Sequence, residues 1–258
     1  MDDGRDREEG PGTADRKMRR IIFLLLLGIL LAGCQTDRKG VRINLTEAVR
    51  AYRQGLDRKP DRAQMERLVA SLSAEQLNDM GVIYEREGRL DRAEWAYQHS
   101  VWRSPRFAVA YVNLGNVLRT QGKTEDALFR YRQAMSADRA SFDAANNFAD
   151  LCAEKRVHLD EALGRLKSAA KNPGPHQAYG LDTLGWLYHL TGDDARAAET
   201  LNAALTNSGA KDTGLRLAIH EHLAAVYGAM GKQAAAQAQQ EAVETIRKQS
   251  GTSGHPAG

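Results

Sequence analysis

Small and apolar residues recur along the chain with a period of 34 residues. Within each period, apolar residues spaced three and four apart predict amphipathic helices. Helical amphipathicity alone does not explain pairs of small residues seven apart at the same phase of each period. Such a repeat is typical of stacked helical units that share one continuous core. The residues that set the phase are Gly81, Gly88, Ala93 and Tyr97, followed 34 residues later by Gly115, Gly122, Ala127 and Tyr131.

The period continues toward the C-terminus with two slips. Gly185 and Gly192 repeat the phase of Gly81 and Gly88, and the 70 residues that separate Gly115 from Gly185 leave room for a 36-residue unit. A fifth unit follows after a five-residue insertion. The expected organisation is therefore a partial capping unit at 44–73 and full units at 74–107, 108–141, 142–177, 178–211 and 217–250.

Residues that commonly start helices stand at the expected starts. Ser73-Ala-Glu-Gln76 has the sequence of a capping box, in which the serine and the glutamine each bond the other's backbone amide. Asp91 and Thr124 stand where the second helices of two units are expected to begin. These residues agree with the helix boundaries that the period predicts.

The pattern resembles the tetratricopeptide repeat (TPR). In that family the eighth residue of a unit is small because two helices cross there, which fits Gly81 and Gly115. A proline such as Pro105 ends a second helix because it has no amide hydrogen. The resemblance implies an all-α fold: a TPR-type α-solenoid, or right-handed superhelix of antiparallel helix hairpins. It also implies a concave groove that binds other proteins or their extended peptides.

The N-terminal segment has the zones of a secretory signal. Three basic residues lie within 17–20, and the apolar run 21–31 is too short to span a bilayer. Two small residues then precede Cys34, and the ending Leu31-Ala-Gly-Cys34 resembles the lipobox of bacterial lipoproteins. That resemblance implies cleavage before Cys34 and lipidation (palmitate among the lipids) of its sulfur. An ordinary signal peptide or a buried hydrophobic helix is the alternative.

This reading divides the ends of the chain into short segments. We expect a dispensable extension or long n-region at 1–17, a lipoprotein signal peptide at 18–33, a lipidated tether at 34–43 and a disordered tail at 251–258. Translation could begin at Met1 or at Met18. By resemblance, Gln35 after the lipidated cysteine favours the outer membrane over the inner membrane.

Composition and charge exclude several classes of protein. The 36 basic and 33 acidic residues give a formal net charge of +3 and are spread along the chain, so a nucleic-acid partner is not expected. Two cysteines are too few for a disulfide framework or a multi-cysteine metal site.

Few residues are candidates for catalysis. His220 and His222 form the densest histidine cluster, but residues two apart diverge on a helix, so solvated groove histidines are favoured over a metal site. Cys152 stands at a core position and is expected to be buried and inert. No phosphate loop or nucleophile elbow occurs in the sequence. We therefore expect no enzyme activity, cofactor, metal or small-molecule substrate.

The resemblance implies that certain first-helix positions face the groove. Val112 and Tyr179 occupy places that carry lysine in chaperone-binding relatives, so the clamp for a chaperone's C-terminal carboxylate is missing. Trp186 could form an anchor pocket with Tyr179, or it could pack on the next unit's helix, and we expect binding but not folding to depend on the groove. The candidate residues are Asn116, Arg119, Asn146, Asn147, Asp150, Tyr179, Asp182, Trp186 and His189.

Together these features predict a protein-interaction scaffold or adaptor, tethered to an envelope membrane and facing the periplasm. Such a protein would support assembly or stability of a pilus, secretion, export or peptidoglycan machinery. The alternative is a periplasmic chaperone or carrier that binds exported polypeptides transiently. An enzyme is a further alternative, and the histidine cluster is the only feature of the sequence that favours it.

Overall fold

A computed structural model describes residues 71–170 and 176–252 of the chain. The expected signal peptide, Cys34, the tether, nearly all of the capping unit and residues 253–258 lie outside these ranges. Within them the regular elements are α-helices and no β-strand occurs. None of the described helices combines the length and apolar character that crossing a membrane requires.

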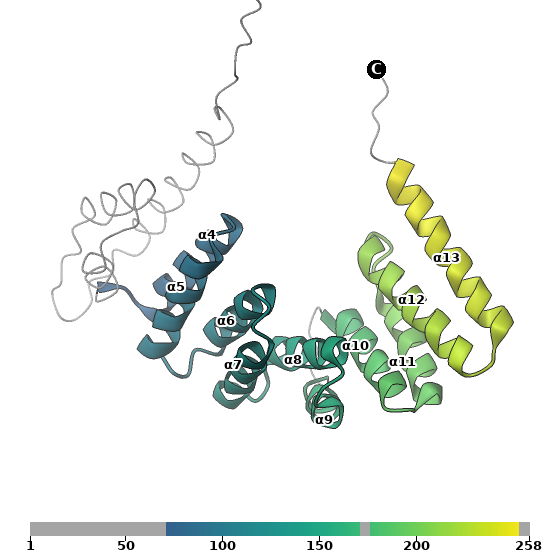
Figure 1. Cartoon of the computed structure of the whole chain (residues 1–258), viewed down its shortest axis with the longest axis horizontal. Coiled ribbons are helices and arrows are strands. Elements are labelled where there is room, and N and C mark those ends of the chain that lie inside the picture. Colours follow the sequence, from purple (N-terminus) through teal and green to yellow (C-terminus); the bar gives the residue numbers. More distant parts are fainter. Residues whose placement is uncertain (1–70, 171–175, 253–258) are drawn as a thin grey trace, which may run out of the picture. The chain divides into compact units, whose positions relative to one another are not determined.

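Ten helices are described, and they follow one another with short connections (Figure 1). The fifth hairpin starts at Thr213, four residues before the expected unit boundary at 217, because part of the predicted insertion is the first turn of its first helix. The helices are α4 (Ala74–Arg86), α5 (Leu90–Arg103), α6 (Ala108–Thr120), α7 (Thr124–Ala137), α8 (Phe142–Lys155), α9 (Leu159–Ala169), α10 (Gln177–Leu190), α11 (Asp194–Asn207), α12 (Thr213–Ala229) and α13 (Gln233–Thr252).

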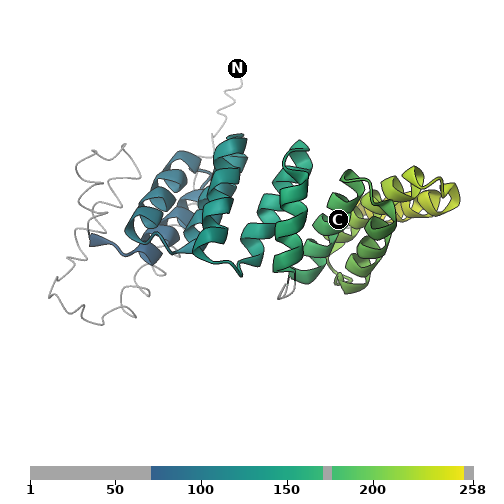
Figure 2. The ribbon, with the colours of Figure 1, turned by 90° about the horizontal axis from the view of Figure 1, so that it is seen from below.

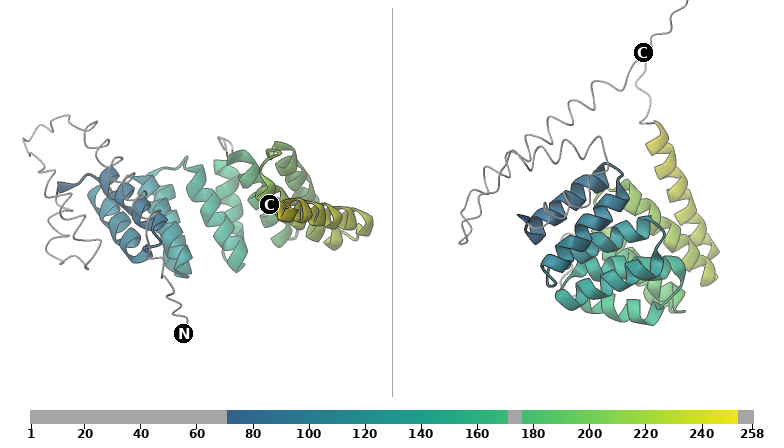
Figure 3. Two further views of the ribbon diagram at one scale, coloured as in Figure 1. Left: turned by 90° about the horizontal axis from the view of Figure 1, so that it is seen from above. Right: turned by 60° about the vertical axis from the view of Figure 1, so that its left-hand side comes forward.

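The helices pair into five antiparallel hairpins, α4–α5, α6–α7, α8–α9, α10–α11 and α12–α13 (Figure 2). Each second helix also packs against the first helix of the next hairpin, and successive first helices contact one another. Figure 3 shows the same succession from two further directions. The described part of the chain is thus an all-α stack of hairpins, which confirms the predicted fold class.

Glycine at the eighth position lets the two helices of a hairpin approach closely. A Cβ atom added to Gly81 would lie 2.5 Å from Tyr97 Cε1, and one added to Gly115 would lie 2.4 Å from Tyr131 Cε1. Both tyrosine rings are completely buried. The predicted crossing points are therefore real contacts between each first helix and its partner.

The second glycine that recurs in the repeat has a different role from the first. Gly88 and Gly122 turn the chain between helices with φ of +71° and +76°, a region that side chains with a Cβ rarely adopt. Arg156 takes the equivalent place between α8 and α9 with φ of 55°. Its amide bonds Ala153 O and the next amide bonds Cys152 O, as in the glycine turns. The third hairpin therefore makes the same turn with a residue that is strained there.

The helix starts agree with the sequence only in part. The capping box at Ser73 is present, with its hydroxyl accepting from the amide of Gln76 and the Gln76 side chain accepting from the amide of Ser73. Asp91 and Thr124 lie inside the first turns of α5 and α7, and the residues before those helices make no side-chain cap. Their expected capping role is wrong, since the turn backbone places another residue at the cap.

Candidate partner-binding face

The candidate groove residues lie on three neighbouring first helices, α6, α8 and α10, with related residues on α4 and α12. We call this surface the first-helix face. It is defined by Asn78, Val109, Asn116, Arg119, Asp143, Asn146, Asn147, Asp150, Glu154, Tyr179, Asp182, Trp186, His189, Glu221 and His222.

Asparagines link the first helices in the N-terminal half of the face. The Asn113 amide donates to Asn78 Oδ1 at 2.9 Å, joining α6 to α4. Asn116 Oδ1 accepts from the Asn147 amide at 2.9 Å and from the buried Tyr131 hydroxyl at 2.8 Å. Asn116 therefore links α6 to α8 and to a core side chain, and these bonds argue against the expectation that folding does not depend on it.

An arginine bridges α6 and α8 beside these amides. Arg119 donates to Asp150 at 2.6 Å and to Glu154 at 2.8 Å. The two carboxylate side chains remain 50% and 43% exposed. Hydrogen bonds from Lys155, and then from Arg119, lower the pKa of the Glu154 carboxyl. The bridge fixes the helices but leaves carboxylate oxygens accessible.

Trp186 is packed between two histidines on the C-terminal half of the face. Its ring stacks on His222 of α12, with centroids 4.4 Å apart and planes 15° apart, and lies 4.9 Å from His189. His222 donates to Asp182 at 2.8 Å and His189 donates to Asp194 at 2.5 Å. Of the two alternatives for Trp186, the structure shows packing on the next hairpin's helix.

Two apolar side chains of the face remain open. Val109 on α6 is 53% exposed and Tyr179 on α10 is 46% exposed. The Tyr179 hydroxyl donates to Asp212 at 2.6 Å, which holds the ring in place while leaving it accessible. Val112, which the resemblance placed in the groove, is buried instead. Val109 and Tyr179 are therefore accessible apolar side chains of the first-helix face.

Asn146 shows how the links between first helices change at the α8–α10 junction. Its Oδ1 is buried and has no hydrogen-bond partner within the described ranges. At equivalent places, Asn78 and Asp182 accept from a side chain on the next first helix. On α10 that place is taken by Thr183, whose hydroxyl donates to its own helix at Tyr179 O.

The residues considered for catalysis are placed as follows. His220 is 8% exposed and donates to Gln239, so the expectation that it is solvated in the groove is wrong. Cys152 is completely buried, and burial raises the pKa of its thiol to about 12, which confirms the expected buried thiol. In the part of the chain that the structure describes, no group of three potential metal ligands occurs.

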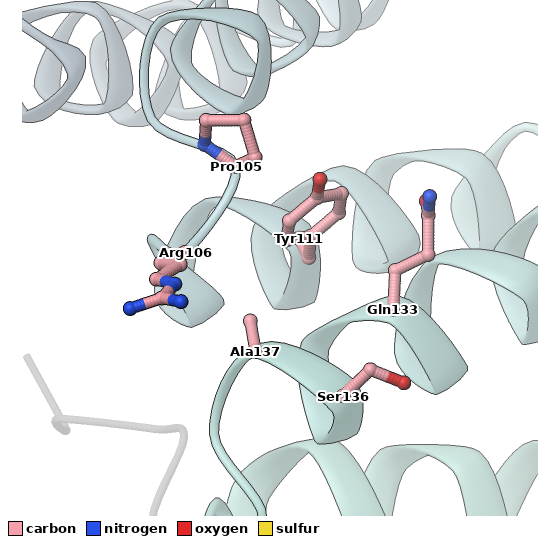
Figure 4. Close-up of a pocket in the computed structure, with 6 residues that line it drawn as sticks. All are labelled: Pro105, Arg106, Tyr111, Gln133, Ser136 and Ala137. Carbon is pink, nitrogen blue, oxygen red and sulfur yellow. The ribbon is translucent and has the colours of Figure 1, made fainter.

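An open pocket of about 420 Å³ lies away from this face, between the α5–α6 connection and the end of α7. It is lined by Pro105, Arg106, Tyr111, Gln133, Ser136 and Ala137. The Arg106 side chain points away from Gln133 and Ser136 (Figure 4). Because its polar groups do not converge, the pocket does not resemble a catalytic site.

Sequence reasoning missed the residues that bind one first helix to the next. Asn113, Asn147 and His222 occupy the sixth position of their units, and each points back to the preceding first helix. Only Asn147 was among the candidates. The signal was a polar residue at the sixth position of three units, on first helices that pack against the neighbouring hairpins.

One hairpin of the chain matches a known family model. The family model described as tetratricopeptide repeat matches residues 108–141, which are α6, α7 and their connections. The chain contains a tetratricopeptide repeat at 108–141. No curated protein sequence matches this chain significantly.

Solved structures share the TPR fold at low sequence identity. PilF of Pseudomonas aeruginosa is 19% identical, with a TM-score of 0.57 over 67% of this chain and 76% of that chain. MamA (41-end) of Desulfovibrio magneticus RS-1 is 14% identical, with a TM-score of 0.58 over 68% and 96% of the two chains. PilW, described as a widely conserved type IV pilus biogenesis factor, is 15% identical, with a TM-score of 0.60 over 68% and 78%. These likenesses show the TPR solenoid fold.

Proposed function

We propose that this TPR protein is a non-catalytic scaffold or adaptor that docks other envelope proteins on its first-helix face. The observation that carries the proposal is the exposure of Val109 and Tyr179 on that face, where a hydrogen bond to Asp212 orients the Tyr179 ring. An accessible apolar side chain held in one orientation is what an interface anchor requires.

The proposal places the protein on a bacterial envelope membrane, facing the periplasm and anchored by lipid on Cys34. It rests on the lipobox-like sequence before Cys34 and the short apolar run. The outer membrane is the favoured location because Gln35 follows the anchor.

We propose that the docked partner is part of an envelope assembly, such as a pilus, secretion, export or peptidoglycan machine. PilW, which is described as a pilus biogenesis factor, has the same fold and supports this class. The fold is shared by proteins with other tasks, so it does not choose among the assemblies.

Absence of catalysis is part of the proposal. Several titratable side chains on the face are held in pairs, as in Arg119 with Asp150 and His222 with Asp182. The Cys152 thiol is inaccessible. These groups support a structural and docking role rather than an acid, base or nucleophile.

A periplasmic chaperone or carrier is the second candidate. Separate exposed apolar side chains on α6 and α10 would also suit transient contacts with unfolded segments. A single stoichiometric partner in crosslinked envelopes supports the scaffold, whereas a broad range of clients supports the chaperone.

The anchor is tested by Cys34→Ala in cells labelled with palmitate. We expect loss of the label and accumulation of uncleaved precursor. Labelling that survives the substitution contradicts the anchor and leaves the docking proposal untouched.

Docking is tested by Tyr179→Ala, with Phe129→Ala as the matched control. Phe129 is 52% exposed but lies on the second helix α7, away from the face. Truncating a central aromatic anchor costs about 2 kcal/mol, or roughly thirtyfold in affinity. We expect partner capture to fall for Tyr179→Ala only. Equal capture by both variants would place docking elsewhere.

A further inference from the structure

Charge is distributed unevenly between the two rows of helices. With histidine neutral, the first helices α4, α6, α8, α10 and α12 carry formal charges of −2, +1, −2, −1 and 0. The second helices are neutral except for α11 at −1. The whole chain is +3, so the negative charge of the first helices is not a general property of the protein.

The carboxylates on α8 remain open to a partner. Asp143 is exposed and lies one turn before Asn146 and Asn147, on the same side of the helix. Asp150 and Glu154 both accept from Arg119, and Glu154 also pairs with Lys155. The two carboxylate side chains still remain 50% and 43% exposed. An ionised carboxylate has about four acceptor sites, so each can receive further donors.

Tyr179 adds an aromatic surface on α10, the first helix of the next hairpin, which packs against α8. Asp212 accepts a hydrogen bond from its hydroxyl, which orients the ring and places another carboxylate at its edge. A guanidinium that stacks on an exposed aromatic ring gains cation–π attraction, and a carboxylate nearby strengthens its binding. The ring suits arginine as well as an apolar side chain.

We infer that the segment docking on the first-helix face is a basic peptide in which Lys or Arg alternates with apolar residues. Its cations lie on Asp143, Asp150 and Glu154, and its apolar or arginine side chains lie on Val109 and Tyr179. This inference rests on the proposed docking function and adds the chemistry of the partner. Charge complementarity selects this occupant over an acidic or neutral segment.

The probes are two labelled decapeptides, one alternating arginine with leucine and one alternating glutamate with leucine. Binding to the full chain is followed by fluorescence anisotropy at 50 mM and 200 mM salt. We expect the basic peptide to bind at least about tenfold tighter at low salt and to lose affinity at high salt, because exposed ion pairs are screened.

Two sets of neutral variants locate the site. The face set is Asp143→Asn with Asp150→Asn and Glu154→Gln, and the control set is Asp160→Asn with Glu199→Gln on second helices. We expect the face set to weaken binding of the basic peptide about tenfold and the control set to leave it unchanged. Equal binding of both peptides, or equal effects of both sets, overturns the inference.

A photocrosslinker at Val109 separates this inference from the proposed function. A basic partner segment crosslinked there supports both, and an acidic segment keeps the docking function while refuting the basic partner. If Val109 gives no crosslink to any envelope protein, docking on this face fails as well.

Discussion

Replacing Gly115 by alanine adds one methyl group where α6 crosses α7. The new Cβ would lie 2.4 Å from Tyr131 Cε1 and 2.7 Å from Cδ1. Carbon atoms that do not bond prefer a separation of about 3.5–4.0 Å. The Tyr131 ring is completely buried and its hydroxyl is bonded to Asn116, so it cannot swing away. The helices must therefore move apart by about 1 Å to restore that separation.

A second glycine, Gly164, serves as a control that separates the cost of the clash from the change in helix propensity. Overpacking of this kind costs about 1–3 kcal/mol. Alanine in a helix interior gains about 1 kcal/mol over glycine, which offsets part of that cost in Gly115→Ala. Gly164, in the interior of α9, has nothing within 4 Å of an added Cβ, so Gly164→Ala keeps the gain without the clash.

The assay is urea unfolding of the full chain followed by circular dichroism. We expect Gly164→Ala to raise the midpoint and Gly115→Ala to fall below it by the equivalent of about 1–3 kcal/mol. Repeat arrays can depart from two-state unfolding, so midpoints of the two variants are compared under identical conditions. If both variants are stabilised equally, the crossing at Gly115 is wrong.

Three further predictions concern stability. Asn116→Ala should lower the free energy of unfolding in urea by about 1–3 kcal/mol, because the buried Tyr131 hydroxyl loses its acceptor. Asn116→Asp keeps an acceptor and should cost less, and equal stability of wild type and Asn116→Ala refutes the network. Arg156→Gly should raise the free energy of unfolding by about 1 kcal/mol, because glycine tolerates φ of 55°. A lower stability would show that the arginine side chain contributes more than its backbone strain costs. Hydrogen bonds from Arg132, and then Arg165, lower the pKa of Glu161 to about 2, so its contribution of about 1–2 kcal/mol is complete above pH 4.5 and is lost as pH falls toward 2. Glu161→Gln should flatten that acid limb of the stability–pH curve, and an unchanged limb counts against the ion pair.

The stack of hairpins could be predicted because its causes repeat in the sequence. Gly81 and Gly115 must be small for helices to cross, and this requirement recurs at a fixed spacing. The turn at Arg156 could not be predicted in this way. Its backbone hydrogen bonds hold a left-handed conformation, which an arginine in the sequence does not indicate.

The candidate face was harder to predict than the fold. Position in the repeat placed Asn116 and Trp186 on first helices correctly, but it could not tell an open side chain from one bonded to a neighbour. That distinction depends on the residue on the next helix. Asn147 and His222 take up the polar and aromatic surfaces that a partner was expected to use.

The central claim is that the first-helix face docks a partner protein. Site-specific photocrosslinking in cells, with the crosslinker at Tyr179 and in parallel at Glu199 on α11, tests it most directly. The account predicts one envelope protein crosslinked from Tyr179 and none from Glu199. Crosslinking from Glu199 alone, or from neither position, would contradict it.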